Sequence, residues 1–173
     1  MFAGACVETP RGRLEIPSIP ASSAGPDLRE WVMGSEGRFG VISEVKVRVT
    51  TLAEQEDFYV IFFPSWDKAK SAARHMVQSK VQLSMLRISN EIETVTQLAL
   101  AGHPKQIELM EKFLAWRGAD EGKCMMTLGV TGMPAQCRSS LSLVKRTTKP
   151  YGGVYTGAYL GKKWAQKRFM MPY

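Results

Sequence analysis

Three glycines at a fixed spacing, Gly34, Gly37 and Gly40, mark the part of this 173-residue chain best suited to binding a ligand. Glycine has no side chain, so a loop built on it can bring backbone N–H groups close to a phosphate or a ring edge. Ser35 adds a hydroxyl group, and Glu36 adds an acceptor for a hydroxyl or an amide. The same spacing fits a helix end followed by a tight turn with positive φ, so both interpretations stay open. A P-loop and a Rossmann fingerprint do not fit, because a helix precedes the glycines.

Other residue types that often do chemistry are sparse. His75 and His103 stand far apart, with no carboxylate or cysteine at ligand spacing, so we predict surface or helix-end positions and no metal site. The three cysteines form no CxxC pair, which favours free thiols in a reducing compartment over a disulfide framework. Cys124 and Cys137 are predicted core residues. No Ser/His/Asp set can be assembled, so no catalytic residue is predicted.

The net charge of +7 is unevenly distributed. Residues 122–173 carry nine Lys and Arg and no Asp or Glu, whereas residues 1–121 have a net charge of −2. A basic segment invites a nucleic-acid or anionic-ligand partner, but its balancing acids could also lie on another part of a longer protein. We interpret the pairs at 145–146 and 162–163 as helix-end or solvent-facing cations.

Composition indicates a globular chain, with 45% apolar and 23% charged residues. The longest apolar run, residues 58–63, is far shorter than the roughly 20 residues of a membrane span. No signal-peptide pattern opens the chain. We therefore expect no transmembrane segment and a cytoplasmic location.

The elements that must position the glycines lie in residues 1–52. Two short strands at 3–9 and 13–16, joined by a Pro-Arg-Gly turn, predict a hairpin. A helix of about two turns is expected to begin at Pro26 and to end at Gly34. Valines alternate with charged residues over 41–51, which predicts a half-buried strand. These residues form no evident core of their own.

After the acidic stretch at 54–57 the pattern becomes a regular alternation of strands and helices. Strands are expected at 58–63, 82–88, 124–130 and 154–160, and helices at 65–78, 90–102, 107–117, 134–149 and 164–169. This order is typical of a ferredoxin-like unit, an antiparallel sheet with helices on one face. We therefore predict an α+β fold with a ferredoxin-like domain at 53–173.

Several separated segments resemble the FAD-linked oxidases of the vanillyl-alcohol oxidase type. Their order in the chain matches that family, and the later ones are most similar to the alkyl-dihydroxyacetone-phosphate synthase group and its bacterial relatives. The segments are VETPRG at 7–12, SAGPDL at 23–28, GSEGRFGVISE at 34–44, LRIS at 86–89, TQLALAG at 96–102 and WAQKRFMMPY at 164–173.

The resemblance implies that residues 1–52 are the last strands of an FAD-binding domain and that residues 53–173 are a substrate-side cap. It places the adenosine-diphosphate half of FAD against the loop, whose cofactor-binding residues would be Ser35, Glu36, Gly37, Arg38, Phe39, Gly40 and Val41. At Arg38 relatives often have a small or polar residue, so its side chain either reaches the pyrophosphate or points into water. The family's other FAD phosphate loop would precede residue 1, and its later catalytic residues would follow residue 173.

The resemblance also matches Arg87 to an arginine that meets the charged group of the substrate. A guanidinium group pairs in bidentate fashion with a phosphate or a carboxylate, which suits that role. Arg87 lies in an apolar predicted strand. A structural ion pair or an exposed position at the strand end would account for it equally well.

The function expected from this resemblance is part of an FAD-dependent oxidoreductase or alkyl-dihydroxyacetone-phosphate synthase-like enzyme. The expected partner is a small anionic substrate, and the chain alone is expected to be inactive. Exposed apolar surface could support a homo-oligomer. The alternative is a stand-alone ferredoxin-like module that binds nucleic acid or a protein. We expect no nucleic-acid partner, because the strands lack closely spaced aromatic residues with Lys or Arg before glycine.

Overall fold

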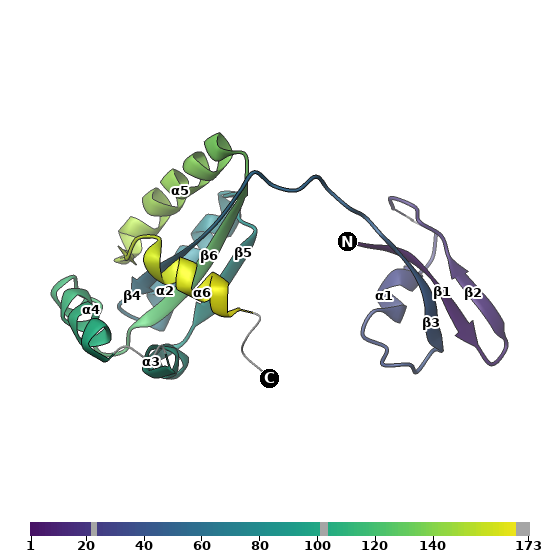
Figure 1. The fold of residues 1–173 in the computed structure, drawn as a ribbon, viewed down its shortest axis with the longest axis horizontal. Coiled ribbons are helices and arrows are strands. Elements are labelled where there is room, and N and C mark those ends of the chain that lie inside the picture. Colours follow the sequence, from purple (N-terminus) through teal and green to yellow (C-terminus); the bar gives the residue numbers. More distant parts are fainter. Residues whose placement is uncertain (22–23, 101–103, 169–173) are drawn as a thin grey trace. The chain divides into compact units, whose positions relative to one another are not determined.

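The structure, a computed structural model, describes residues 1–21, 24–100 and 104–168. These residues form two compact units, Met1–Leu52 and Ala53–Tyr173 (Figure 1). We refer to them as unit 1 and unit 2 and consider each by itself. Within the described ranges, no helix has both the length and the apolar character needed to cross a membrane.

Unit 1 is a three-stranded antiparallel sheet with one short helix, and its strand order is β2-β1-β3. The elements are β1 (Phe2–Thr9), β2 (Gly12–Ile16), α1 (Leu28–Val32) and β3 (Val41–Val47). The predicted hairpin is confirmed as β1 and β2. Helix α1 begins two residues later than expected, because Asp27 is its N-cap and accepts the N–H of Arg29 at 2.9 Å. Pro26 therefore precedes the helix.

The prediction that residues 41–51 form a half-buried strand is wrong in its burial and too long. Strand β3 ends at Val47, and every one of its residues is exposed. The apolar side chains of Val45 and Val47 are 52% and 59% exposed. Strand β3 is an edge strand, and the small core of unit 1 lies around β1 and α1 without any residue of β3. The alternation of valines with charged residues therefore predicted the strand correctly, but it did not show whether another element packs on the apolar side of that strand.

Unit 2 contains a four-stranded antiparallel sheet with the order β5-β6-β4-β7. This is the strand order of a ferredoxin-like βαββαβ unit, so the predicted α+β fold is confirmed. The elements are β4 (Gln55–Phe63), α2 (Trp66–Gln78), β5 (Met85–Ser89), α3 (Glu91–Leu100), α4 (Pro104–Trp116), β6 (Cys124–Gly132), α5 (Pro134–Thr148), the 3-10 turn η1 (Lys149–Tyr151), β7 (Val154–Tyr155) and α6 (Tyr159–Lys167).

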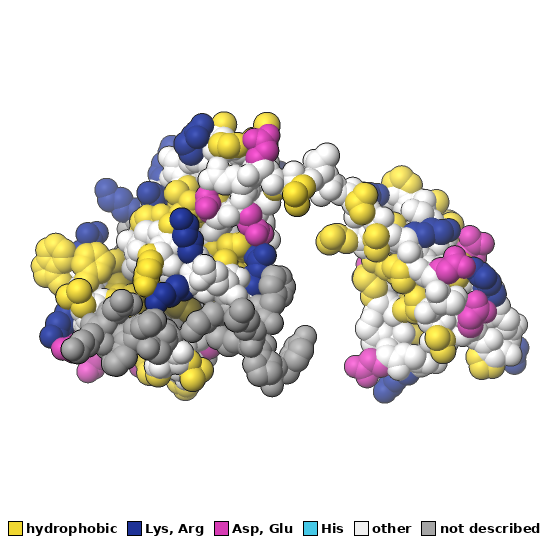
Figure 2. All heavy atoms as spheres, viewed as in Figure 1, with side chains coloured by type: hydrophobic (Ala, Val, Ile, Leu, Met, Phe, Trp, Pro, Cys, Tyr) yellow, Lys and Arg dark blue, Asp and Glu magenta, His cyan; other side chains and the backbone are white. Residues whose placement is uncertain are grey.

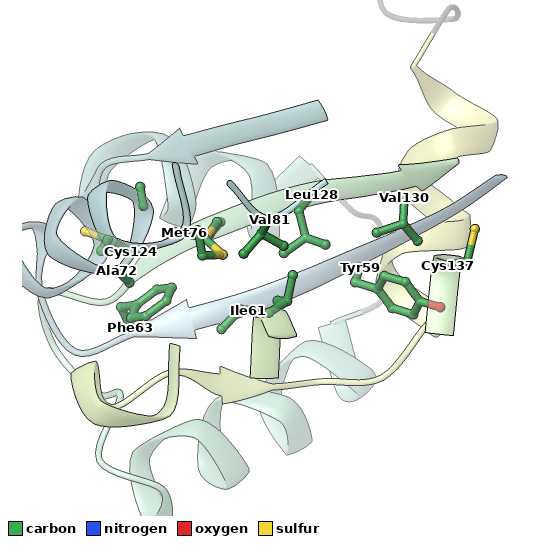
Figure 3. Close-up of a cluster of buried hydrophobic side chains, with 14 residues drawn as sticks. Tyr59, Ile61, Phe63, Ala72, Met76, Val81, Cys124, Leu128, Val130 and Cys137 are labelled. Atoms are coloured by element: carbon green, nitrogen blue, oxygen red, sulfur yellow. The ribbon is translucent and has the colours of Figure 1, made fainter. Parts of the chain in front are cut away.

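Helices α2 and α5 cover one face of this sheet (Figure 1). Alternate residues of β4, namely Tyr59, Ile61 and Phe63, point to this face and pack with Met76 of α2 and Val144 of α5 (Figure 3). Because side chains alternate along a strand, β4 can be buried on both faces only if its other residues also find cover.

The other face of the sheet carries three further helices. Val60 and Phe62 of β4 pack there with Leu98 of α3, Leu114 at the end of α4 and Leu160 of α6. Helices α3 and α4 are inserted between β5 and β6, where a simple ferredoxin-like unit has a hairpin. The six residues of β4 from 58 to 63 are thereby all buried, which explains their continuous apolar run.

The last strand is much shorter than expected, and the last helix begins earlier. Strand β7 has only Val154 and Tyr155. Both the N–H and the hydroxyl of Thr156 then bind the carbonyl of Val60, and Gly157 turns the chain with φ 79°. Helix α6 lies so close to β4 that a side chain at Gly161 would come within 1.7 Å of the Phe58 carbonyl oxygen.

Candidate functional site

The predicted cofactor-binding residues 35–40 lie in one surface loop between α1 and β3, and Val41 is the first residue of β3. Glu36 and Gly37 both adopt positive φ, at 50° and 81°, and Gly34 and Gly40 do so as well. A positive φ is uncommon for a residue that has a side chain and costs about 1 kcal/mol. Such strained backbone is concentrated at functional segments, so the conformation of Glu36 favours a functional role for this loop.

The three glycines serve different purposes. A side chain at Gly40 would lie 2.3 Å from the carbonyl oxygen of Glu8, so this glycine allows the loop to pack on β1. Around the ideal Cβ positions of Gly34 and Gly37 no described atom lies within 4 Å. Gly40 is therefore explained by folding alone, whereas Gly34 and Gly37 leave open space beside the backbone.

Some of the loop's N–H groups are engaged within the loop and others are not. Arg38 donates to the carbonyl of Ser35 at 3.0 Å, and Gly40 donates to that of Gly37 at 3.3 Å. In the described part of the chain no hydrogen bond engages the N–H groups of Glu36, Gly37 and Phe39. Neighbouring N–H groups that are exposed and unengaged fit the phosphate groups of a dinucleotide such as FAD.

The helix before the loop is anchored by one ion pair. Arg29 Nη2 lies 2.6 Å from Asp27 Oδ2, and Arg29 Nη1 donates to the carbonyl of Ile19 at 2.9 Å. The hydrogen bonds from the Arg29 guanidinium hold the pKa of Asp27 below its usual value. Beyond the helix, the rings of Trp31 and Phe39 stack with centroids 5.8 Å apart. The ion pair therefore holds the start of α1, and the ring contact ties the loop residue Phe39 back to the helix.

Unit 2 contains a cleft of about 620 Å³ on the sheet face that carries α3 and α6. Its floor comes from β4 and β6, one wall from α3 and the other from α6. Most of the lining is apolar, with polar and charged groups towards the ends. The lining residues include Val60, Arg87, Ile92, Glu93, Gln97, Leu98, Met125, Leu160, Lys163, Trp164 and Arg168.

Arg87 lines this cleft and also forms an ion pair, so the structural ion pair that the sequence left open is present, while its substrate role stays a prediction. Strand β5 carries Arg87, and its Nη2 donates to Glu93 Oε1 in the first turn of α3. The Arg87 side chain is 51% exposed. Asn90 caps α3, and its Oδ1 accepts the N–H of Glu93 at 2.9 Å. The guanidinium therefore lies beside a helix N-terminus at the edge of an apolar cleft.

Two cations, one in α6 and one directly after it, belong to the same cleft, and sequence reasoning missed both. Lys163 was interpreted as solvent-facing, but it lies over the ring of Tyr159 at 4.8 Å and lines the cleft. Arg168 Nη2 lies 3.2 Å from Glu56 Oε2, and its guanidinium lies 4.8 Å from the centroid of the Phe58 ring. The helical spacing of residues 160, 163, 164 and 168 places them near one side of the helix, but charged residues at such a spacing usually face water, so the sequence contains no signal of a cleft.

A second, more apolar cleft of about 770 Å³ lies between α4 and α6. It shares Leu160 and Lys163 with the first cleft. Trp116 and Leu109 of α4 are 78% and 71% exposed. Figure 2 shows hydrophobic side chains gathered over α4, in the left part of the view.

The remaining chemical candidates are structural. All three cysteines are free and buried, and Cys124 and Cys137 belong to the core as predicted. His75 lies in the last turn of α2, with its ring edge-on to Tyr151 at 5.9 Å, while His103 lies outside the described residues. Among the described residues no group of three or more His, Cys, Asp or Glu side chains could hold a metal ion.

Comparison with known proteins gives the family. The family described as FAD linked oxidases, C-terminal domain, matches residues 52–172. The chain belongs to the FAD-linked oxidase family. It is 28% identical to alkyldihydroxyacetonephosphate synthase of Dictyostelium discoideum, over 95% of this chain and 28% of that protein. It is 26% identical to a mitochondrial D-lactate dehydrogenase (cytochrome) of Kluyveromyces lactis, over 58% of this chain and 18% of that protein.

The fold is shared along the whole chain. A solved structure of alkyldihydroxyacetonephosphate synthase matches with a TM-score of 0.79 at 26% identity, covering 100% of this chain and 32% of that one. The chain therefore spans about a third or less of the length of the relatives that it matches. The resemblance found in the sequence segments is confirmed at the level of the family.

Proposed function

We propose that the chain forms part of an FAD-dependent enzyme, in which unit 1 contributes to the FAD site and unit 2 forms the substrate-side cap. The observation that carries this proposal is the placement of Arg87, with Lys163 and Arg168, around one apolar cleft. Family membership and the match along the whole chain support an enzyme rather than a stand-alone binding module.

In this proposal the loop at 34–41 binds the adenosine-diphosphate half of FAD. The N–H groups of Glu36, Gly37 and Phe39 donate to its phosphate oxygens, and the open space beside Gly34 and Gly37 admits the approach. The Arg38 side chain is exposed and supplies positive charge near that position. When bound, FAD supplies the redox chemistry of its ring system, and the chain supplies binding and orientation.

Arg87 is proposed to bind the anionic group of the substrate. One guanidinium N–H is used by Glu93, which leaves further donors for a phosphate or a carboxylate. Lys163 and Arg168 add positive charge from the opposite wall, and the apolar lining between them can receive an apolar part of the substrate. This cleft also gives part of the basic excess in residues 122–173 a role without a nucleic acid.

The reaction proposed first is of the alkyl-dihydroxyacetone-phosphate synthase type, because that likeness covers 95% of the chain. The second candidate is oxidation of a 2-hydroxy acid, favoured by the likeness of 58% of the chain to a D-lactate dehydrogenase. In both, Arg87 would hold the acidic group. Activity needs parts of the relatives that this chain does not match, so we expect no activity from these 173 residues alone.

Two accompanying proposals concern the protein's surroundings. The three free, buried thiols support a reducing compartment, for which we propose the cytoplasm. The exposed Trp116 and Leu109 of α4 support self-association through α4. Alanine at both positions should lower the apparent mass in size-exclusion chromatography if α4 forms the contact, and an unchanged mass would remove α4 from consideration.

The test of the proposed function uses the complete gene product that contains this chain. It should be purified with bound FAD, and the visible absorbance of the flavin gives the occupancy. Arg87→Ala should weaken binding of an anionic probe about tenfold or more, because hydrogen bonds to charged groups are the strong ones. Arg74→Ala is the matched control, since Arg74 is an exposed arginine of α2 that does not line the cleft. A protein without FAD, or an Arg87 variant that binds normally, would refute the proposal.

A further inference from the structure

Glu93, in the first turn of α3, links the proposed substrate arginine, Arg87, to the helix that forms one wall of the cleft. We propose that it is a positioning residue, which holds the Arg87 guanidinium in the orientation that an anionic substrate requires. This inference rests on the proposed function, because that function assigns Arg87 to the substrate. Arg87 is half exposed, and within the described residues Glu93 is the acid with which it pairs. Without Glu93 the guanidinium would be free to turn into solvent.

Glu93 is itself held from two directions. Its backbone N–H is bound by Asn90 Oδ1 at 2.9 Å. Its Oε1 also accepts from Gln97 Nε2 at 3.0 Å, and that same nitrogen lies 3.1 Å from Ser89 Oγ. Because Asn90 holds the backbone of Glu93 and Gln97 donates to its carboxylate, the carboxylate has a fixed orientation. It can therefore orient the guanidinium of Arg87, which donates to the same oxygen.

The helix that carries Glu93 is fixed to the sheet by a buried threonine. Thr94 is completely buried, and its hydroxyl donates to the carbonyl of Ser89 at 3.3 Å. The hydroxyl oxygen of Thr94 also accepts the N–H of Met125 in β6 at 3.0 Å. Glu93 and Arg87 are therefore attached to neighbouring parts of one rigid frame, and the ion pair closes it at the edge of the cleft.

The pair has two opposite effects on an anion. The carboxylate orients Arg87, but its negative charge also repels the ligand. Glutamine at position 93 removes the charge and retains an oxygen that can accept from both Arg87 and Gln97. Alanine removes both the charge and the oxygen. The comparison between these two variants therefore isolates orientation from charge.

The experiment measures binding of inorganic phosphate and of D-lactate to the complete, FAD-loaded gene product by calorimetric titration. Glu93→Gln should bind the better probe at least as tightly as the unsubstituted protein does. Glu93→Ala should bind it about five-fold more weakly than Glu93→Gln, because Arg87 regains rotamer freedom. Glu91→Ala is the matched control, since Glu91 is an exposed acid in the same first turn that does not line the cleft.

The outcomes separate the two proposals. Equal binding by Glu93→Gln and Glu93→Ala, with Arg87→Ala still defective, would overturn the positioning role and leave the proposed function intact. Tighter binding by Glu93→Ala than by Glu93→Gln would show that the side chain obstructs the ligand, and would overturn the inference as well. If neither probe depends on Arg87, the proposed function itself fails.

Discussion

The two units of this chain bury apolar side chains to very different extents. In unit 2 the sheet is covered on both faces, and Phe62, Phe63 and Met126 are completely buried. In unit 1 the core consists of four small or medium side chains around β1 and α1, with Phe2 packed against it, while the valines of β3 are exposed. Burial of apolar surface is the main stabilising term in folding, so unit 2 is expected to be much the more stable.

The difference also separates two kinds of site. The cleft of unit 2 is built on a strand end and two packed helices, so its charged side chains sit on a rigid frame. The loop of unit 1 offers backbone groups on a unit with little core, and its geometry depends on glycines and on the ion pair of Asp27 with Arg29. Stability measurements can therefore test whether the two sites are independent.

The largest expected effect comes from the core of unit 2. Phe62→Ala should lower the unfolding free energy of unit 2 by about 3–5 kcal/mol, because it removes a fully buried aromatic side chain and leaves a cavity. The signal of Trp31, the single tryptophan of residues 1–52, should stay unchanged. Urea unfolding followed by fluorescence and by circular dichroism measures both units.

The matched substitution in unit 1 is Val7→Ala, which removes a buried side chain of the small core. It should cost about 2 kcal/mol and shift the Trp31 transition alone. If either substitution shifts both transitions together, the units unfold as one, and the comparison drawn above fails.

A further pair of substitutions distinguishes Gly40, which folding requires, from the exposed Gly37. Gly40→Ala should destabilise unit 1 by about 3 kcal/mol, because its Cβ would meet the Glu8 backbone and its φ is 138°. Gly37→Ala meets no atom and should cost only about 1 kcal/mol for its positive φ. Thermal unfolding measures both. An equal loss of stability in the two variants would contradict the open space beside Gly37.

The last prediction is a pH dependence confined to unit 2. Burial and the nearby charge of Asp57 raise the pKa of Tyr59 from 10.0 to about 12. The unfolded chain ionises this tyrosine first, so its contribution to stability is present below pH 10 and is lost as the pH rises towards 12. Between pH 10 and about pH 12, the unfolding free energy of Tyr59→Phe should therefore fall less than that of the unsubstituted protein. A tyrosine that titrates by absorbance at its ordinary pKa would contradict this.

Much of the architecture was predictable from local signals. The Pro-Arg-Gly turn and the patterns that predicted a helix at 90–102 and a strand at 124–130 each act over a few residues, and the structure has the hairpin, helix and strand that they indicate. The errors arose where a local pattern does not show whether another element packs against a strand. The alternating valines of β3 have no partner layer, and the apolar residues 154–160 are divided between a short strand and α6.

The candidate site shows the same division. Residue types and the family resemblance singled out the loop at 34–41 and Arg87, and the structure places the loop residues together at the surface and Arg87 at a cleft. Glu93, Lys163 and Arg168 escaped notice because their neighbours come from other elements. Charged side chains at helical spacing usually face water, so spacing alone could not reveal a shared cleft.

The sequence by itself determined most of the elements and the ferredoxin-like order in residues 53–173, because periodicity, caps and turn residues are properties of neighbouring positions. The likeness of several separate segments to the FAD-linked oxidases indicated the family. Only the tertiary structure decided which strand faces stay covered and which charges meet. The insertion of α3 and the close approach of α6 to β4 at Gly161 create the cleft beside Arg87. That arrangement depends on contacts between residues far apart in the chain, which no local pattern encodes.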